Sequence, residues 1–172
     1  MGSRKWWGLV VSLVLVSACY GGMTAKAELD RGLAYGNGAG VPQNYQKSNY
    51  WLRKAAMQGN AIASEVLAHS YRHGIAGVSR NYQKALFWLK KAAAQGSGLA
   101  KYRLAVYYFI GKYVPQNYVR AYKWMILAKA GAPPSKYEMV SKDARSLVSL
   151  MSPSQIARAQ SMAAAWERAH EK

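Results

Sequence analysis

One motif recurs three times along this 172-residue chain, and its near-constant spacing limits the fold more than any other feature of the sequence. The anchor residues of the three copies lie 36 or 37 positions apart. These anchors are Tyr35, Tyr71 and Tyr108, then Gly38, Gly74 and Gly111, then Trp51, Trp88 and Trp124. Repeats of this length are typical of solenoids, in which each unit buries its apolar face against its neighbours.

The first half of each copy predicts a helix, which we call helix A. Small and large apolar residues share one arc of its helical wheel. They are Ala63, Leu67, Ala68 and Tyr71 in the second copy and Ala100, Leu104, Ala105 and Tyr108 in the third. Gly74 and Gly111 then end the helix, because glycine adopts the left-handed conformation that a side chain resists.

The second half of each copy predicts another helix, helix B, which begins after a loop. Asn44, Asn81 and Asn117 are suited to cap its N-terminus. Its apolar stripe in the second copy consists of Ala85, Trp88, Leu89, Ala92 and Ala93. Alanine at these positions allows the two backbones to approach closely, as a helical hairpin requires.

We therefore predict an all-α fold, an α/α solenoid of three helix-pair repeats with C-terminal capping helices. The repeats occupy residues 28–60, 61–97 and 98–134, and the capping helices occupy residues 135–172. The second capping helix opens on a capping box in which Ser152 is the N-cap, Pro153 the first helical residue and Gln155 the third. Its apolar stripe of Ile156, Ala159, Ala163 and Trp166 is predicted to cover the open end of the last repeat.

The motif L-G-x-x-Y-x-x-G-x-G-V, then A-x-x-W, then A-A-x-x-G, resembles the Sel-one-like (Sel1-like) repeat, a relative of the tetratricopeptide repeat. The chain departs from it at Arg31 and Ser48, where the family has Leu and Ala, and at Tyr113, which replaces a loop glycine. These departures predict an imperfect first repeat and a third loop of different shape. The resemblance implies an adaptor that binds proteins or glycans on the concave surface lined by the A helices.

Residues 1–27 predict a secretory signal, so we expect export to the bacterial periplasm. Its apolar segment, Trp6 to Ala18, is too short to span a bilayer comfortably. Cleavage after the Ala25-Lys26-Ala27 site would release a soluble protein that begins at Glu28. Alternatively, Val16-Ser17-Ala18-Cys19 resembles a lipobox, which would end the signal at residue 18 and make Cys19 a lipidation site that anchors the protein to the outer membrane.

The charge of the chain is strongly basic, with 24 Lys and Arg against 7 Asp and Glu and a formal net charge of +17. Between Arg31 and Glu138 the only acidic residue is Glu65. This imbalance favours acidic or polyanionic partners, although cations on helical repeats also commonly form a plain solvated face. The single cysteine, Cys19, excludes an intramolecular disulfide framework and a Cys-based metal site.

The sequence supplies few groups for catalysis. Between Arg31 and Glu138 the repeats hold no pair of carboxylates, and the glycines end helices rather than cradle a phosphate. Glu65, His69 and His73 lie four residues apart on one helix face, a spacing that could hold Zn²⁺. We favour the alternative, an exposed face on which His69 bonds Glu65, and expect no metal, no cofactor and no enzymatic activity. A further alternative is hydrolysis of an envelope glycan or a β-lactam. Within the family, β-lactam hydrolysis has been linked with members whose paired cysteines this chain lacks.

The face of helix A opposite the predicted core is the first candidate binding surface, which we call the A groove. It carries Glu65, His69 and Arg72 in the second repeat and Tyr102, Val106 and Phe109 in the third. A polar patch beside an apolar, aromatic patch is typical of an interaction surface. The alternative is that the capping helices fold over Tyr102, Val106 and Phe109 and make them part of the core.

Helix B carries the second candidate surface, the basic face. Lys47, Lys84 and Arg120 stand at equivalent repeat positions, and they are reinforced by Arg53, Lys54, Lys90 and Lys91. In an exported protein this face could contact anionic lipid, lipopolysaccharide or acidic polysaccharide, whereas nucleic acid is not expected as a partner. The main hypothesis is an exported scaffold that binds an envelope protein or polymer, and the alternative is a polyanion-binding module. We expect membrane contact only through a lipid anchor or the basic face.

Overall fold

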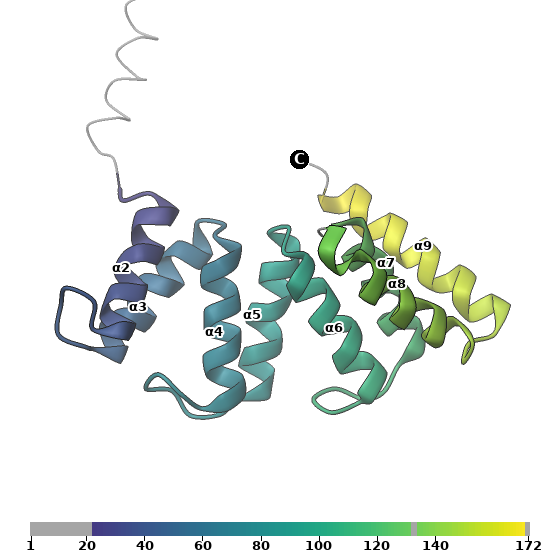
Figure 1. The fold of residues 1–172 in the computed structure, drawn as a ribbon, viewed down its shortest axis with the longest axis horizontal. Helices are drawn as coiled ribbons and strands as arrows, with labels where there is room; N and C mark the ends of the chain where they lie inside the picture. Colours follow the sequence, from purple (N-terminus) through teal and green to yellow (C-terminus); the bar gives the residue numbers. More distant parts are fainter. Residues whose placement is uncertain (1–21, 132–133, 171–172) are drawn as a thin grey trace, which may run out of the picture.

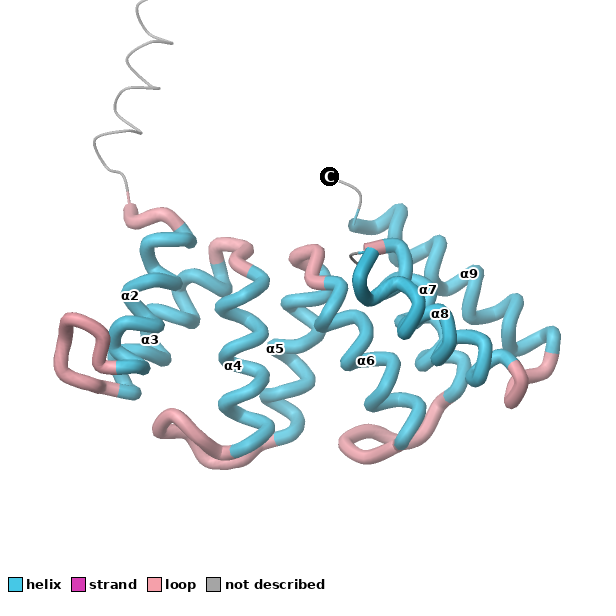
Figure 2. The backbone as a smooth tube through the Cα atoms, viewed as in Figure 1, coloured by secondary structure: helices cyan, strands magenta, loops and turns pink. Residues whose placement is uncertain are grey.

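A computed structural model of the chain describes residues 22–131 and 134–170, which contain helices and no strand (Figures 1 and 2). The A helices of the three repeats are α2 (Ala25–Asn37), α4 (Ala61–His73) and α6 (Gly98–Ile110). The B helices are α3 (Tyr45–Met57), α5 (Tyr82–Ala94) and α7 (Tyr118–Ala130). The chain ends in α8 (Pro134–Val148) and α9 (Pro153–His170). Most of the predicted signal, including Cys19, lies outside the described residues.

Each repeat is a hairpin of two helices, and the hairpins stack in chain order. Helix α2 packs on α3, α4 on α5 and α6 on α7, while α3 meets α4 and α5 meets α6 between repeats. In Figure 1 the three hairpins form an arched row, with the first repeat at one end and α8 and α9 at the other. The predicted α/α solenoid is therefore confirmed.

The core contains the apolar residues that the helical wheels of helix A and helix B predicted to be buried. Every residue of the two predicted A-helix arcs is buried, and Leu67 and Leu104 are fully enclosed. The predicted stripe of α5 is likewise the set of buried residues in that helix. Because alanines such as Ala63, Ala92 and Ala100 are completely buried at helix contacts, any larger side chain there would push two helices apart.

The loop between helix A and helix B has the same hydrogen bonds in all three repeats. The side chains of Asn44, Asn81 and Asn117 accept from the N–H group three residues later, at 2.9, 2.8 and 2.8 Å. Their own N–H groups donate to the carbonyl of the anchor tyrosine of the same repeat, at 2.8, 2.7 and 2.8 Å. Gly74 and Gly111 end the A helices at φ 70° and 73°, so the predicted caps are confirmed.

Departures from the repeat pattern in the second and third loops create contacts between repeats. The second loop contains one extra residue, and Ala76 there has a φ of 54° and accepts a hydrogen bond from Asn49 Nδ2 of α3 at 2.8 Å. In the third loop the Tyr113 ring packs 4.5 Å from the Tyr82 ring and 4.8 Å from the Tyr107 ring. The tyrosine that replaces a loop glycine thus fills space between the second and third repeats.

The first repeat differs from the others around its tryptophan. Trp51 is half-buried, whereas Trp88 and Trp124 are buried. The Arg31 guanidinium lies 4.9 Å from the centre of the Trp51 ring, in place of an apolar side chain. A cation over an aromatic face is favourable, so Arg31 partly replaces the packing that a leucine would give.

The capping helices both pack on α7 and not chiefly on each other. Trp166 of α9 meets the Trp124 ring edge-to-face at 5.6 Å. The predicted capping box is present, because Ser152 N donates to Gln155 Oε1 at 2.9 Å and Gln155 N donates to Ser152 Oγ at 3.3 Å. The stripe of α9 covers α7 as predicted.

Candidate interaction surfaces

Two polar residues of the A groove join the second repeat to the third. The Glu65 carboxylate accepts a hydrogen bond from Ser97 Oγ at 2.5 Å and lies 3.8 Å from Arg103 Nη1. Arg72 Nη1 donates to the Tyr107 hydroxyl at 3.3 Å. These contacts tie α4 to α6, so Glu65 and Arg72 already have partners within the protein.

His69 remains exposed beside these contacts. Its ring lies 4.5 Å from the His73 ring. The expected bond between His69 and Glu65 is wrong, because the Glu65 carboxylate is bound to side chains that α4 does not carry. Partial burial, followed by the charges of His73 and two nearby arginines, lowers the pKa of His69. This environment favours the neutral imidazole.

The third-repeat part of the A groove is covered at one end only. The Tyr102 hydroxyl donates to Asp143 Oδ2 of α8 at 2.7 Å, and burial together with this hydrogen bond raises the pKa of Tyr102 to about 12. Val106 is half-buried. Phe109 is exposed, and its ring centroid lies 5.9 Å from that of Tyr118. Tyr102 therefore contacts the capping helix, whereas Phe109 stays open to solvent.

A hollow of about 490 Å³ between α2 and α4 extends this surface toward the first repeat, and we did not predict it. His69, Leu33, Gly36 and Val66 are among the residues that line it. Repeat spacing is the signal that could have found it, since Gly36 stands where the later repeats have Arg72 and Phe109. Gly36 also packs closely on α3, since a Cβ atom at this position would lie 3.0 Å from Ser48 Oγ.

The three cations at equivalent positions of the basic face have one geometry. The Nζ atoms of Lys47 and Lys84 and the Cζ atom of Arg120 lie 5.3, 5.5 and 5.6 Å from the ring centroid of the anchor tyrosine in their own repeat. All three side chains are exposed. The ring holds each cation at the surface, so the charges repeat with the period of the fold.

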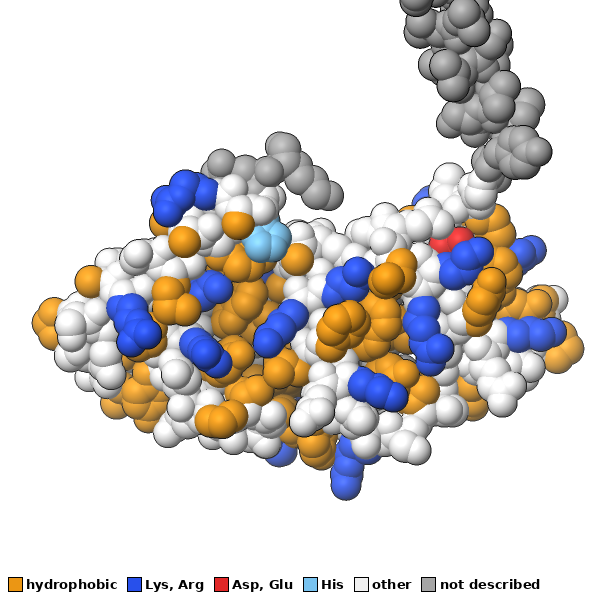
Figure 3. Space-filling view, turned by 180° about the vertical axis from the view of Figure 1, so that it is seen from behind, with side chains coloured by type: hydrophobic (Ala, Val, Ile, Leu, Met, Phe, Trp, Pro, Cys, Tyr) orange, Lys and Arg blue, Asp and Glu red, His pale blue; other side chains and the backbone are white. Residues whose placement is uncertain are grey.

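Two of the reinforcing cations of the basic face have partners. Arg53 Nη2 donates to the Tyr71 hydroxyl at 3.3 Å, and Lys54 Nζ lies 3.5 Å from the buried Glu28 carboxylate. Lys90 is exposed and Lys91 is half-buried. Seen from behind the view of Figure 1, Lys and Arg side chains are spread along the molecule between hydrophobic ones, with little acidic surface (Figure 3).

Lys123 belongs to the same positive region, and our sequence reasoning missed it. Its Nζ lies 4.7 Å from the centre of the Trp124 ring. Burial, and then the charges of Arg120 and Lys90, lower the pKa of Lys123. Cations of α5 and α7 thus lie close enough to repel one another, which an anionic ligand would relieve.

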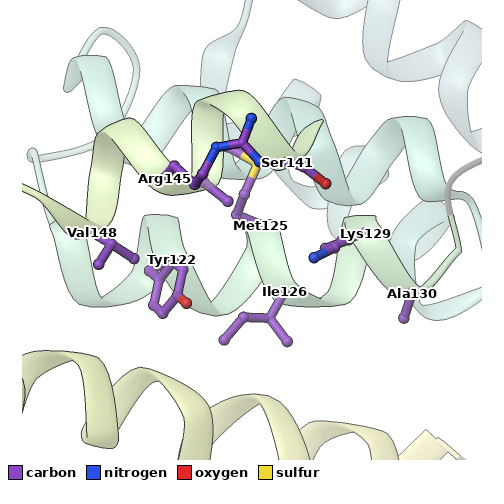
Figure 4. Close-up of a pocket in the computed structure, with 9 residues that line it drawn as sticks. Tyr122, Met125, Ile126, Lys129, Ala130, Ser141, Arg145 and Val148 are labelled. Carbon is purple, nitrogen blue, oxygen red and sulfur yellow. The ribbon is translucent and has the colours of Figure 1, made fainter. Parts of the chain in front are cut away.

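A second recess, which we call the C-terminal groove, lies between α7 and α8 and has a volume of about 760 Å³. It is lined by Tyr122, Met125, Ile126, Lys129, Ala130, Ser141, Ala144, Arg145 and Val148 (Figure 4). The sequence did not reveal it, because a helical pattern does not show how closely α8 approaches α7.

Among the described residues, no group of three or more His, Cys, Asp or Glu side chains could hold a metal ion. Within the same residues, no helix combines the length and hydropathy that crossing a membrane requires.

The repeats match a known family. The Sel1 repeat family matches residues 25–60, 62–97 and 98–131, which correspond to the three helix pairs. A search of curated proteins found no match.

Two solved structures are similar over most of the chain. A Sel1 repeat protein from Oxalobacter formigenes is 28% identical with a TM-score of 0.63, over 80% of this chain and 98% of that one. The protein c5321, a protective antigen of uropathogenic Escherichia coli strains that displays an SLR fold, is 26% identical with a TM-score of 0.66. That similarity covers 97% of this chain but 34% of c5321, so this chain spans about a third of that protein's length.

Proposed function

Since the chain belongs to the Sel1 repeat family, we propose that it is an exported, non-catalytic scaffold that binds an envelope protein or polymer through its A helices. Sel1 repeat proteins are typically scaffolds for protein interaction. The observation that carries the proposal is that the A helices present the hollow between α2 and α4, which exposed His69 lines, together with exposed Phe109 on α6. The capping helix α8 contacts this face at Tyr102 and leaves Phe109 exposed.

A capture experiment from an envelope extract tests this proposal. We expect Val66→Asp, in the hollow, and Phe109→Ser, at the far end, to reduce recovery of the same partner, identified by mass spectrometry. Tyr50→Ser is the matched control, because Tyr50 is an exposed aromatic residue on the B helix α3. Equal recovery by all variants would reject the A-helix surface as the binding site.

Export and anchoring are part of the proposal, and the start of α2 supports cleavage before Cys19. Thr24 caps this helix by accepting from Ala27 N at 3.2 Å, and Glu28 is only 1% exposed. Cleavage after Ala27 would remove the cap and put a charged amino group at a buried residue, which is unfavourable. The mass of the mature N-terminus decides between a lipidated Cys19 and a free Glu28.

Polyanion binding is a second candidate function, favoured by the three exposed cations Lys47, Lys84 and Arg120, which lie over the anchor tyrosines at equivalent repeat positions. Binding to heparin, used as a generic anionic polymer, should weaken as salt rises, because counterion release drives it. The triple variant Lys47→Gln, Lys84→Gln, Arg120→Gln should bind with a shallower salt dependence than the parent. Binding that does not change with salt would exclude this function.

A further inference from the structure

The C-terminal groove arises where α7 departs from the other B helices. Lys129 stands where α3 and α5 have Ala56 and Ala93, both completely buried. A lysine cannot be enclosed in the same way, because its ammonium group needs water or a polar partner. Helix α8 therefore does not close over this part of α7, and the groove remains beside it.

A second substitution makes the groove apolar on its open side. Ile126 stands where α3 and α5 expose the cations Arg53 and Lys90. Ile126 and half-buried Tyr122 line the groove from α7, and half-buried Val148 lines it from α8, so both helices contribute apolar side chains. Lys129 in place of a buried alanine thus leaves the groove between the helices, and Ile126 in place of an exposed cation makes its lining apolar.

The groove has a polar end and an apolar end. Ser141 and Lys129 lie toward one end, and Tyr122 and Val148 lie toward the other (Figure 4). Ser141 is 5% exposed, and its Oγ has no hydrogen-bond partner. A buried hydroxyl without a partner is unfavourable, so a ligand that bonds to it would gain stability.

The charges at the groove favour an anion. Lys129 and Arg145 both line it, and no acidic side chain is among its described lining residues. Arg145 Nη2 lies 3.1 Å from Glu138 Oε1, in a pair whose side chains are 67% and 82% exposed. An exposed ion pair of this kind is weak, so Arg145 can turn to a ligand at little cost.

We propose that the C-terminal groove binds a single-chain carboxylate amphiphile, a fatty acid of medium chain length. The carboxylate accepts hydrogen bonds from Ser141 and Lys129 at the polar end. The hydrocarbon chain lies along Met125 and Ile126 toward Tyr122. Such a ligand supplies in one molecule the acceptor, the negative charge and the apolar length that this recess presents.

Dodecanoate below its micelle concentration is the first probe, in a form that carries a spin label on the chain. We expect it to broaden the methyl NMR signal of Met125, at the groove, and not that of Met57, which is exposed on α3. Unlabelled dodecanoate should compete, whereas acetate, which lacks the chain, and dodecyltrimethylammonium, which has the opposite charge, should not. Equal broadening of both methionines, or equal competition by dodecyltrimethylammonium, would overturn the proposal.

Variants distinguish the groove from general attraction to a basic protein. Ile126→Lys restores the cation of the other repeats and should weaken dodecanoate binding by about tenfold or more, because each methylene group removed from its apolar contact loses affinity. Ser141→Ala should weaken it with the fold unchanged. Lys112→Ala is the control, since it removes one exposed charge in the loop of the third repeat and should leave binding intact.

Three results would overturn this assignment. Tighter binding by Ile126→Lys would show that charge alone attracts the probe. A parent protein that does not bind dodecanoate, but self-associates until Ile126→Lys makes it monomeric, would assign the groove to a second copy of the chain. If an acidic amphipathic peptide displaces the probe and no carboxylate amphiphile does, the groove would be assigned to a partner helix.

Discussion

At the scale of single residues, the shortage of acids explains how the cations are held. Aromatic rings take the place of carboxylates, as when Lys47 and Lys84 lie over the anchor tyrosines of their repeats. The carbonyl of the same tyrosine receives the N–H of the helix-capping asparagine. One tyrosine per repeat thus fixes the loop and positions a surface charge, which accounts for its constant spacing.

His69 gives a pH prediction at this scale. Its pKa is lowered in the folded protein, so between that value and about 6.5 the unfolded chain binds more protons. The stability that neutral His69 contributes is therefore present above pH 6.5 and is lost as pH falls through the folded pKa. We expect His69→Gln to flatten the fall in free energy of unfolding from pH 7 to pH 5. Parallel curves for the parent and the variant would contradict this.

Tyr102 gives a stability prediction. Tyr102→Phe removes the hydrogen bond to Asp143 and leaves that half-buried carboxylate without its donor, which should cost about 1 to 2 kcal/mol in urea unfolding. Tyr118→Phe is the control, since Tyr118 is also half-buried and contacts Phe109 through its ring alone. A similar loss in both variants would mean that the Asp143 contact adds nothing to stability.

At the scale of elements, each helix is delimited by local chemistry and placed by its neighbours. Asparagine caps start every B helix, and left-handed glycines end every A helix. The contacts between elements are less regular. Gln95 Nε2 donates to the Ala56 carbonyl at 2.6 Å, and Gln95 Oε1 accepts from Ser64 Oγ, so Gln95 joins the first repeat to the second. The third repeat has Gly131 at the equivalent position and cannot make these bonds.

The start of α2 gives a prediction at this scale. Thr24→Ala removes the side-chain cap of the helix and should lower the free energy of unfolding by about 1 kcal/mol. A chain that begins at Glu28 should lose at least as much, because it also lacks the contact between Gln58 Nε2 and the Met23 carbonyl at 3.2 Å. Thermal unfolding of the Thr24→Ala variant, the chain that begins at Glu28 and the parent measures both effects. A chain from Glu28 as stable as the parent would remove this support for cleavage before Cys19.

At the scale of the whole molecule, the fold is a one-dimensional stack, in which a helix of one repeat contacts its hairpin partner and the next hairpin in the chain. The third repeat is covered by α8 and α9, and Lys101 of α6 lies 5.0 Å from the Trp166 ring of α9. The first repeat meets a described neighbour on one side only. The two ends of the stack should therefore differ in stability.

Native-state hydrogen exchange tests this difference. We expect amides of α2 and α3 to exchange through openings of lower free energy than those of α4 to α7, because an end repeat loses contacts with one neighbour only when it opens. Leu104→Ala, at a completely buried site, should destabilise the protein by about 2 to 5 kcal/mol and lower the protection of α4 to α7 together. Equal protection of α2 and α6 would contradict the expected fraying.

The sequence by itself determined the repeats, the caps between helix A and helix B, and the core. These depend on local chemistry and on a period of 36 or 37 residues, so glycine ends, asparagine caps and the burial of Leu67 and Trp88 follow from spacing. It also identified the exposed cations of the basic face.

Only the tertiary structure decided which surface groups already have partners and where the recesses lie. Glu65 binds Ser97 instead of His69, and Tyr102 reaches Asp143, because stacking brings side chains from distant helices together. The hollow beside Gly36 and the groove beside Lys129 depend on how closely neighbouring helices approach. A helical wheel shows which face a residue is on, but the distance between two packed helices is set by the side chains of both.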